Sequence, residues 1–207
     1  MKKVSVIILM SIFLVGASTS TSHAGWLFFS KPEFKGRILD AETKEPIQGA
    51  VVAAIYHKYS YHLLGAGTEI CNTRETLTDE KGEFLIPSYY TIIDPFSIED
   101  KTSFIFYKPG YAPGAVNDSP IYYFGRYPEN FFTREIGERA EALKSDATRE
   151  KVMITYGVVE MPKVKNTRKE RLRAMPSRPG LTNSDDLPLL YKAINEENKR
   201  FGRGEVK

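Results

Sequence analysis

The chain has 207 residues, 42% of them hydrophobic, and its 29 Lys and Arg residues against 26 Asp and Glu residues give a formal net charge of +3. This length allows one domain with a core of ordinary size plus an extension, and the near-neutral charge gives no electrostatic case for binding nucleic acid. Cys71 is the single cysteine, which excludes an internal disulfide, and we expect it to be a partly buried strand residue or, alternatively, to pair with a second chain.

The first 24 residues have the pattern of a secretory signal peptide. Two lysines precede the apolar run Val4–Ala17, and Ser22-His23-Ala24 supplies small residues where cleavage requires them, so we expect cleavage after Ala24. The run is short for a membrane span, and none is expected after cleavage. Retention as an anchor is the alternative, because Trp26–Phe29 continues the apolar character. The sequence thus predicts an exported protein, periplasmic or extracellular.

Charge divides the remaining chain into two parts. Residues 25–162 carry an excess of acidic side chains, and residues 163–207 carry an excess of basic ones. We therefore expect a domain over 25–162 and a basic, helical C-terminal extension over 163–207. The extension would lie against its own domain or against an acidic partner.

The first signature of the domain predicts two strands. Lys35–Asp40 alternates in side-chain character and leads into the turn-rich Asp40–Glu45, which indicates a strand followed by a loop. Pro46 is tolerated at the start of the next strand because it has no N–H to offer to a ladder. Gly49 permits a bulge or a close backbone approach. Ala50–Tyr56 is nearly all apolar, as expected for a strand buried in a core.

The second signature predicts a hairpin. Glu75–Asp79 and Glu83–Pro87 have the composition of strands, and Glu80-Lys81-Gly82 joins them with a glycine available for positive φ. We expect the side chain of Asp79 to cap this turn through hydrogen bonds to the backbone. Phe84 would supply an apolar side chain to the core.

The segment between the signatures is the most suggestive chemically. Tyr56–His62 contains two histidines and three tyrosines, which are ligand types for ferric iron or zinc. A metal site needs ligands from at least two elements, and no third histidine remains once His23 leaves with the signal peptide. We therefore expect no metal, no cofactor and no catalytic residue here. We predict a strand end and an exposed loop in which Tyr59, Tyr61 and His62 contact a ligand or partner.

The chain then alternates between loops and strands. Ser88–Lys101 is irregular and predicts a long surface loop, followed by a strand at Thr102–Tyr107. Lys108-Pro109-Gly110-Tyr111 predicts a turn that packs the Tyr111 ring on the core. Ile121–Phe124 fits one more strand.

Apolar residues recur at spacings of three and four over residues 131–149, which predicts an amphipathic helix with Asn130 as its N-cap. Lys151–Met161 alternates like a strand. We therefore expect the helix to be inserted within the β topology, with the strand closing a sheet.

The extension predicts two helices. Thr167-Arg168-Lys169-Glu170 has the spacing of a capping box that opens a short basic helix to about Ala174, and residues 175–184 form a linker. A final helix begins at Leu187-Pro188 and ends at Gly202. The apolar stripe of this helix either packs on the domain or binds in a partner's groove. This stripe consists of Leu190, Tyr191, Ile194 and Phe201.

The domain motifs closely resemble the carboxypeptidase regulatory-like (transthyretin-like) domain family over about residues 33–126. They match, in order, the family's strand glycine, Pro-Ile-x-Gly-Ala, Thr-Asp-x-x-Gly-x-Phe and Lys-x-Gly-Tyr patterns. The resemblance implies a seven-stranded Greek-key-type β-sandwich, mainly β and like transthyretin (prealbumin), with no activity of its own. The residues that would then have structural roles are Gly36, Pro46, Gly49, Ala50, Thr78, Asp79, Gly82, Phe84, Gly110 and Tyr111.

Enzyme signatures are missing from the sequence. It contains no Gly-x-Ser-x-Gly, phosphate-binding loop or dinucleotide fingerprint. Transthyretin-related hydroxyisourate hydrolases end in Tyr-Arg-Gly-Ser, where this chain has Gly204-Glu205-Val206-Lys207. We predict an exported, non-enzymatic module with a binding or structural role in the cell envelope and a protein or glycan partner. The alternatives are a subunit of an envelope assembly that docks through its C-terminal helix, and a small hydrolase or metal-binding enzyme on the same fold.

Overall fold

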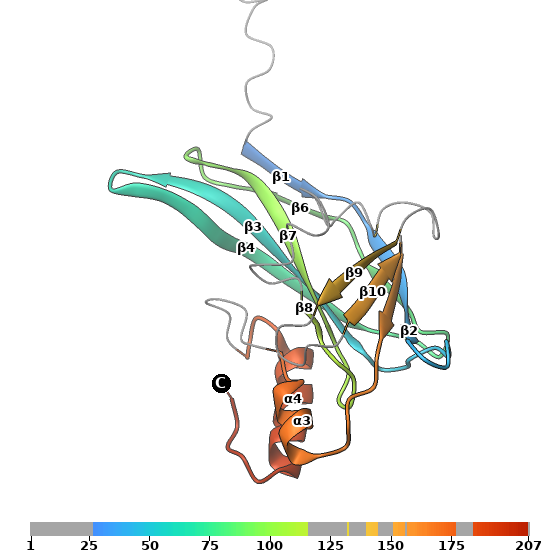
Figure 1. Cartoon of the computed structure of the whole chain (residues 1–207). Coiled ribbons are helices and arrows are strands. Elements are labelled where there is room, and N and C mark those ends of the chain that lie inside the picture. The colour runs from blue at the N-terminus through green and yellow to red at the C-terminus, as the bar shows by residue number, and fades with distance from the viewer. Residues whose placement is uncertain are drawn as a thin grey trace, which may run out of the picture.

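A computed structural model describes residues 27–115, 132, 140–144, 151–155, 157–176 and 184–206. These residues are mainly β, with eleven strands in three sheets and two helices (Figure 1). The strands outnumber the seven that the family resemblance implies. The expected signal peptide at 1–24 and the expected strand at Ile121–Phe124 lie outside the described residues.

The largest sheet has five strands and one parallel pairing. Its order is β5 (Glu83–Ile86), β2 (Phe34–Asp40), β11 (Val158–Met161), β10 (Lys151–Thr155) and β9 (Ala140–Lys144). β11 runs parallel to β2, and the other neighbours are antiparallel. The single strand expected over 151–161 is therefore a hairpin, with Gly157 at a φ of 69° between β10 and β11.

The second sheet has four strands, all antiparallel. Its order is β4 (Gly65–Leu77), β3 (Val51–His62), β7 (Ser97–Tyr107) and β8 (Gly114–Ala115). A separate two-stranded ribbon pairs β1 (Phe28–Lys31) with β6 (Tyr89–Ile92). The helices are α3 (Arg168–Arg173) and α4 (Pro188–Arg200).

The two larger sheets pack on a common aromatic core. The rings of Phe34 on β2 and Phe104 on β7 lie 5.1 Å apart, and Phe132 packs 4.7 Å from Phe104. Further buried members from β2, β3, β5, β7 and β11 are Ile38, Val52, Ala54, Tyr56, Phe84, Ile86, Phe106, Val159 and Met161. This shared core fixes the two sheets face to face.

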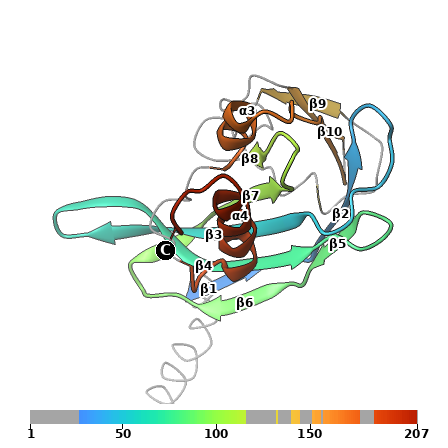
Figure 2. The same ribbon diagram turned by 90° about the horizontal axis from the view of Figure 1, so that it is seen from below.

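α4 covers the outer face of the four-stranded sheet (Figure 2). Leu187, Leu190, Tyr191 and Ile194 are buried against β3 and β7 residues such as Ile55. The run Val51–Tyr56 is therefore buried on both faces, which explains why it is apolar without alternation. Thr167 is confirmed as the N-cap of α3, because its hydroxyl accepts the Glu170 N–H at 3.3 Å. The second bond of a capping box is replaced, because the Thr167 N–H donates to the Lys165 carbonyl at 2.8 Å.

Two expectations along the chain are wrong. The helix expected over 131–149 is not continuous, because Ala140–Lys144 is strand β9, although Phe132 is helical. The pairing of β9 with β10 overrides the helical spacing. The loop expected over Ser88–Lys101 instead contains β6 and the first part of β7. β6 is a strand because β1 pairs with it. The sequence predicts no strand at β1, because Trp26–Phe29 continues the apolar character of the leader.

Close backbone approaches explain two glycines of the signatures. A Cβ on Gly36 would lie 2.6 Å from the Gly157 carbonyl oxygen and 2.8 Å from the Phe84 ring. Gly82 has a φ of 72°, and a Cβ there would lie 2.5 Å from the Ile38 carbonyl oxygen. Both contacts are far shorter than a carbon atom tolerates, so these positions require glycine.

Polar side chains of the signatures join the turns. The buried Thr78 hydroxyl donates to the Ile47 carbonyl at 2.6 Å and accepts the Ala50 N–H at 2.8 Å. Asp79 caps its own turn as expected, because its carboxylate accepts two backbone N–H groups at 2.8 and 2.9 Å. The Tyr111 hydroxyl donates to Asp40 at 3.2 Å.

Candidate functional site

The predicted contact residues lie on a projecting hairpin. β3 and β4 continue together past β7, whose last pair with β3 joins Ser60 and Ser97 (Figures 1 and 2). We define residues 59–68 as the arm. Tyr59, Tyr61 and His62 lie on β3 rather than in the expected loop. β3 pairs with β4 as far as His62 and Gly65, which leaves only the two-residue turn Leu63-Leu64.

The two leucines of this turn are fully exposed, at 102% and 99%. Two-residue hairpin turns favour Asn-Gly, because both positions of the preferred turn take positive φ. Lys44 is the one non-glycine residue with positive φ in the described part of the chain, so neither leucine adopts that conformation. The pair Leu63-Leu64 therefore serves neither the core nor the turn, and such breaches of local rules are expected at functional sites.

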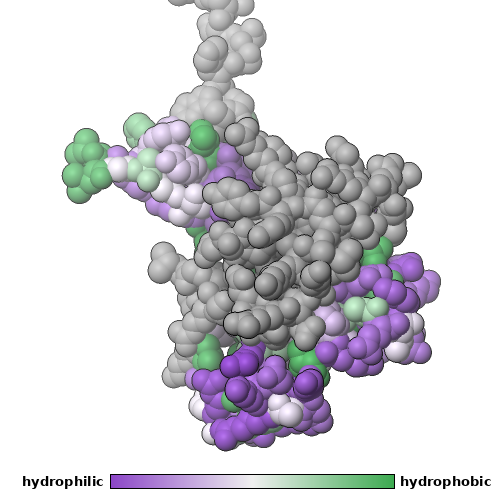
Figure 3. Space-filling model, in the orientation of Figure 1, coloured by the Kyte–Doolittle hydropathy of each residue, from purple (hydrophilic) through white to green (hydrophobic). Residues whose placement is uncertain are grey.

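Further apolar side chains surround the turn. Tyr61 donates its N–H to the Phe96 carbonyl at 2.7 Å, which places the β6–β7 turn beside the arm. We define the tip surface as the exposed residues Tyr61, Leu63, Leu64, Phe96 and Ile98. Figure 3 shows hydrophobic residues at the far end of the arm. Residues 59–68 contain no Asp, Glu, Lys or Arg, so the arm is uncharged apart from His62.

Charged residues lie behind the arm. The ammonium group of Lys58 is 2.6 Å from Asp94 and 3.6 Å from Glu69, and Glu69 is 2.7 Å from the His62 Nε2. The hydrogen bond from Lys58 lowers the pKa of Asp94 to about 2. The hydrogen bond from His62 lowers the pKa of Glu69. These charges form a belt at the base of the arm. Leu63 and Leu64 lie beyond it, whereas Phe96 lies beside Asp94, whose carboxylate accepts the Phe96 N–H at 3.1 Å.

The serine and histidine contacts are not arranged for hydrolysis. Glu69 accepts a hydrogen bond from the buried Ser60 and contacts His62 on its other oxygen, whereas a catalytic histidine lies between the serine and the acid. The His57 Nε2 is 3.0 Å from the Ser103 hydroxyl. Ser103 is only 3% exposed, so a substrate cannot reach it.

Metal ligands do not gather in the described part of the chain. No group of three or more His, Cys, Asp or Glu residues among the described residues is placed to hold an ion. Cys71 is half-buried on β4 as expected, and burial raises the pKa of its thiol. It is the extra residue of a β-bulge, because Tyr56 pairs with Asn72 and His57 pairs with Ile70.

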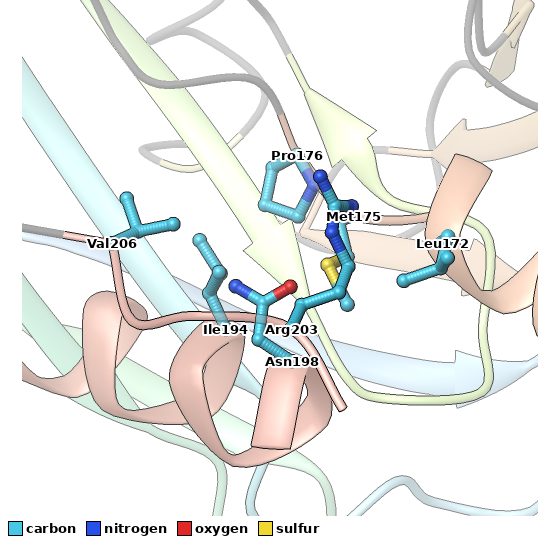
Figure 4. Close-up of a pocket in the computed structure, with 7 residues that line it drawn as sticks. All are labelled: Leu172, Met175, Pro176, Ile194, Asn198, Arg203 and Val206. Atoms are coloured by element: carbon cyan, nitrogen blue, oxygen red, sulfur yellow. The ribbon is translucent and has the colours of Figure 1, made fainter. Parts of the chain in front are cut away.

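A small pocket lies between α3, α4 and the C-terminal segment (Figure 4). Its volume is about 250 Å³, below the 300–1,000 Å³ or so that is typical of ligand sites. Leu172, Met175 and Ile194 line it, together with Asn198 and Arg203. We assign this pocket to imperfect packing of the extension on itself.

The apolar stripe of the C-terminal helix is already occupied. Leu190, Tyr191 and Ile194 are buried against the chain's own sheet. The Glu75 carboxylate of β4 also accepts the N–H groups of Leu189 and Leu190 at the helix start. The expectation that this stripe packs on the domain is therefore confirmed for these three residues, whereas Phe201 is half-buried.

The chain matches no family model, no curated protein and no solved structure. The resemblance to the carboxypeptidase regulatory-like family is thus neither supported nor contradicted. Within the described residues, neither helix has the length and apolarity needed to cross a membrane.

Sequence reasoning missed the most exposed residues of the site, Leu63, Leu64 and Phe96. One signal was present in the sequence. Leu63-Leu64 separates two segments that are rich in tyrosine, threonine and glycine, at a position where a hairpin would need Asn-Gly or a similar pair.

Proposed function

We propose that the protein is an exported, non-enzymatic binding module of the cell envelope, with the tip surface as its contact surface. Its scaffold would be a Greek-key β-sandwich of the carboxypeptidase regulatory-like type. The observation that carries the proposal is the complete exposure of Leu63 and Leu64. Burying a leucine side chain is worth about 1.5–3 kcal/mol, so a contact that covers both would be favourable.

The chemistry of the described residues supports binding rather than catalysis. The serine hydroxyls near histidine are buried and satisfied by neighbours. The arm offers apolar and aromatic side chains and contains no Asp, Glu, Lys or Arg. This composition suits an apolar contact better than a glycan, which requires many hydrogen-bond donors and acceptors.

Export is tested by expressing the full chain with a C-terminal tag and fractionating the cells. We expect the protein in the envelope or periplasmic fraction, and mass spectrometry of the recovered chain would show whether residues 1–24 have been removed. Recovery in the cytoplasm alone would contradict the proposal.

Contact through the tip surface is tested by sedimenting envelope material with the wild-type chain and with the double variant Leu63→Asn/Leu64→Gly. We expect the variant to lose at least half of the association, because the turn keeps its length while both apolar side chains disappear. Leu85→Asn is the matched control, since Leu85 is an exposed leucine on β5. Equal association of the wild type and the double variant would refute this contact.

A further inference from the structure

We propose that the tip surface inserts into the interfacial layer of a phospholipid bilayer. This inference rests on the proposed function, in which the tip surface is the contact surface. It adds the chemical class of the partner, because the tip surface would contact lipid rather than a groove on another protein.

The arm changes polarity along its length in the order of a membrane interface. Leu63 and Leu64 form the end, and the rings of Tyr59 and Tyr61 follow, 5.2 Å apart in an edge-to-face arrangement. Lys58 and its partner Asp94 lie behind them, and the Glu69 carboxylate extends from β4 along the arm to Ser60 and His62, at 3.0 and 2.7 Å. Hydrocarbon accommodates leucine, the headgroup boundary favours tyrosine, and charges remain in water.

The dimensions agree with this order. At about 3.3 Å per residue, Tyr61 lies roughly 7 Å behind Leu63 along the strand and Tyr59 roughly 13 Å behind it. Interfacial segments bury their apolar parts to a depth of about 5–10 Å. The leucines therefore reach the acyl boundary when the tyrosines lie at the level of the headgroups.

The backbone limits the depth of insertion. β4 is the edge strand of its sheet, so the outer N–H and C=O groups of Gly65–Thr68 need water or headgroups as partners. Hydrocarbon offers no such partners. The arm is thus suited to shallow insertion of the turn and unsuited to spanning a bilayer.

The start of the described chain lies at the same end of the molecule. In Figure 1, β1 begins near the β6–β7 turn in the upper part of the molecule, the arm extends farther to the left, and α3 and α4 lie in the lower part. The outer face of the β1–β6 ribbon exposes Phe28, Tyr90 and Ile92, and the Phe28 and Tyr90 rings stack at 5.5 Å. Trp26-Leu27 directly precedes β1 in the sequence. The ribbon therefore exposes apolar side chains of its own.

A protein groove fits this surface less well. Leucine is under-represented among the residues that dominate protein–protein binding, where Trp, Tyr and Arg prevail. The two most exposed side chains here are leucines, and no arginine lies on the arm. Two leucines carry fewer carbons than one myristoyl chain, which binds membranes with a constant of about 10⁴ M⁻¹. We therefore expect the arm to give weak, reversible contact that orients the molecule on a surface.

The test measures the depth of single sites in the full chain. Cys71→Ser removes the one native thiol, and Leu64→Cys then accepts an environment-sensitive fluorophore. We expect its emission to shift to the blue when protein-free phosphatidylethanolamine–phosphatidylglycerol vesicles are added, and lipids with shallow quenchers to quench it more than lipids with deep ones. The matched control is the label at Lys81→Cys, in the β4–β5 turn at the other end of β4, which lies on the opposite side of the molecule from the arm (Figure 2).

The outcomes separate the two proposals. No shift at residue 64, or equal shifts at residues 64 and 81, overturns the lipid inference. If Leu63→Asn/Leu64→Gly loses its association with envelope material while pure lipid leaves the label at residue 64 unchanged, the occupant is a protein and the proposed function stands. If the double variant keeps its envelope association as well, both proposals fail. A shift confined to residue 64 supports the insertion.

Discussion

The two halves of β3 meet very different surroundings. Every residue of Val51–Tyr56 is buried, with the five-stranded sheet on one face and α4 on the other. His57–His62 continues the same ladder with β4, but its last two residues are exposed. Both halves pair with β4, and the pairing with β7 continues from Val51 to Ser60 apart from His57. The difference shows that covering layers, rather than backbone pairing, decide whether apolar residues stabilise this protein or remain available to a partner.

A bulge and a helix start mark the boundary between the halves. The register shifts between Tyr56 and His57. On the buried side, the Thr73 hydroxyl donates to the Asp186 carbonyl at 2.5 Å, and the Glu75 carboxylate caps α4. β4 therefore fixes the point at which the C-terminal extension stops covering the sheet.

Breaking the ion pair between α3 and α4 should have the largest effect on stability. The Arg171 Nε lies 2.5 Å from the Glu197 Oε1, and both side chains are nearly buried. Glu197→Ala should lower the free energy of unfolding by about 3–5 kcal/mol, because it leaves a buried cation unpaired. Urea titration measures this loss. Arg173→Ala, at an exposed ion pair of 3.7 Å, is the control and should change stability by less than about 1 kcal/mol.

Removing one leucine of α4 that covers the inner half of β3 should reduce stability nearly as much. Leu190→Ala should lower the free energy of unfolding by about 2–5 kcal/mol, because Leu190 is fully buried against the sheet. Leu85→Ala at an exposed position should change it by about 0.5 kcal/mol or less. Equal losses in thermal or urea unfolding would remove the distinction between covered and uncovered apolar residues.

The cap on α4 should contribute a smaller share. Glu75→Ala should cost about 1–3 kcal/mol, because two N–H groups at the helix start lose their acceptor. Glu75→Gln keeps one acceptor oxygen and should cost less. A loss for Glu75→Gln as large as that for Glu75→Ala in urea unfolding would show that charge, rather than hydrogen bonding, holds α4 at this point.

The carboxylates of the two regions should respond to pH in opposite directions. Burial raises the pKa of Glu75 above its model-peptide value of 4.5. The stability that this shift contributes is therefore present below pH 4.5 and is lost as pH rises through the folded pKa. The pKa of Asp94 is lowered from 3.8 to about 2, so its contribution is present above 3.8 and is lost as pH falls toward 2. Melting temperatures between pH 2 and 7 should show Asp94→Asn losing its deficit against the wild type in acid. Glu75→Gln should improve relative to the wild type as pH rises through the folded pKa of Glu75, which lies above 4.5.

The smallest effect is expected at the tip. Leu63→Asn/Leu64→Gly should change the free energy of unfolding by only about 0.5 kcal/mol, because neither leucine contacts the core. The Asn-Gly pair in the variant also favours a two-residue hairpin turn. A loss above about 2 kcal/mol in urea unfolding would show that the leucines support the fold, and the argument from their exposure would fail.

Local signals in the sequence predicted those parts of the fold that depend on neighbouring residues. Thr167 caps the start of α3, as its position in the sequence indicates. α4 ends before Gly202, which has the positive φ expected after a helix. The run Ala50–Tyr56 is as buried as its composition suggests. In each case, the residues that set the structure lie within a few positions of one another.

Features that depend on distant partners were not predicted. β6 is a strand because β1 pairs with it, and β9 is a strand because β10 does. Tyr59, Tyr61 and His62 were predicted as contact residues. The length of the arm was not predicted, because the sequence indicates a strand only from Glu75, whereas β4 begins at Gly65 and pairs with β3 from there. The exposure of Leu63-Leu64 follows only from that pairing.

The parallel pairing of β2 with β11 has a consequence for how the chain reaches its final form. β2 lies near the beginning of the domain and β11 near its end, so the central ladder of the five-stranded sheet closes only after most of the polypeptide has been synthesised. Such distant contacts slow folding and leave strand edges unpaired in the meantime. The five-stranded sheet therefore cannot be completed until Val158–Met161 is available to pair with β2.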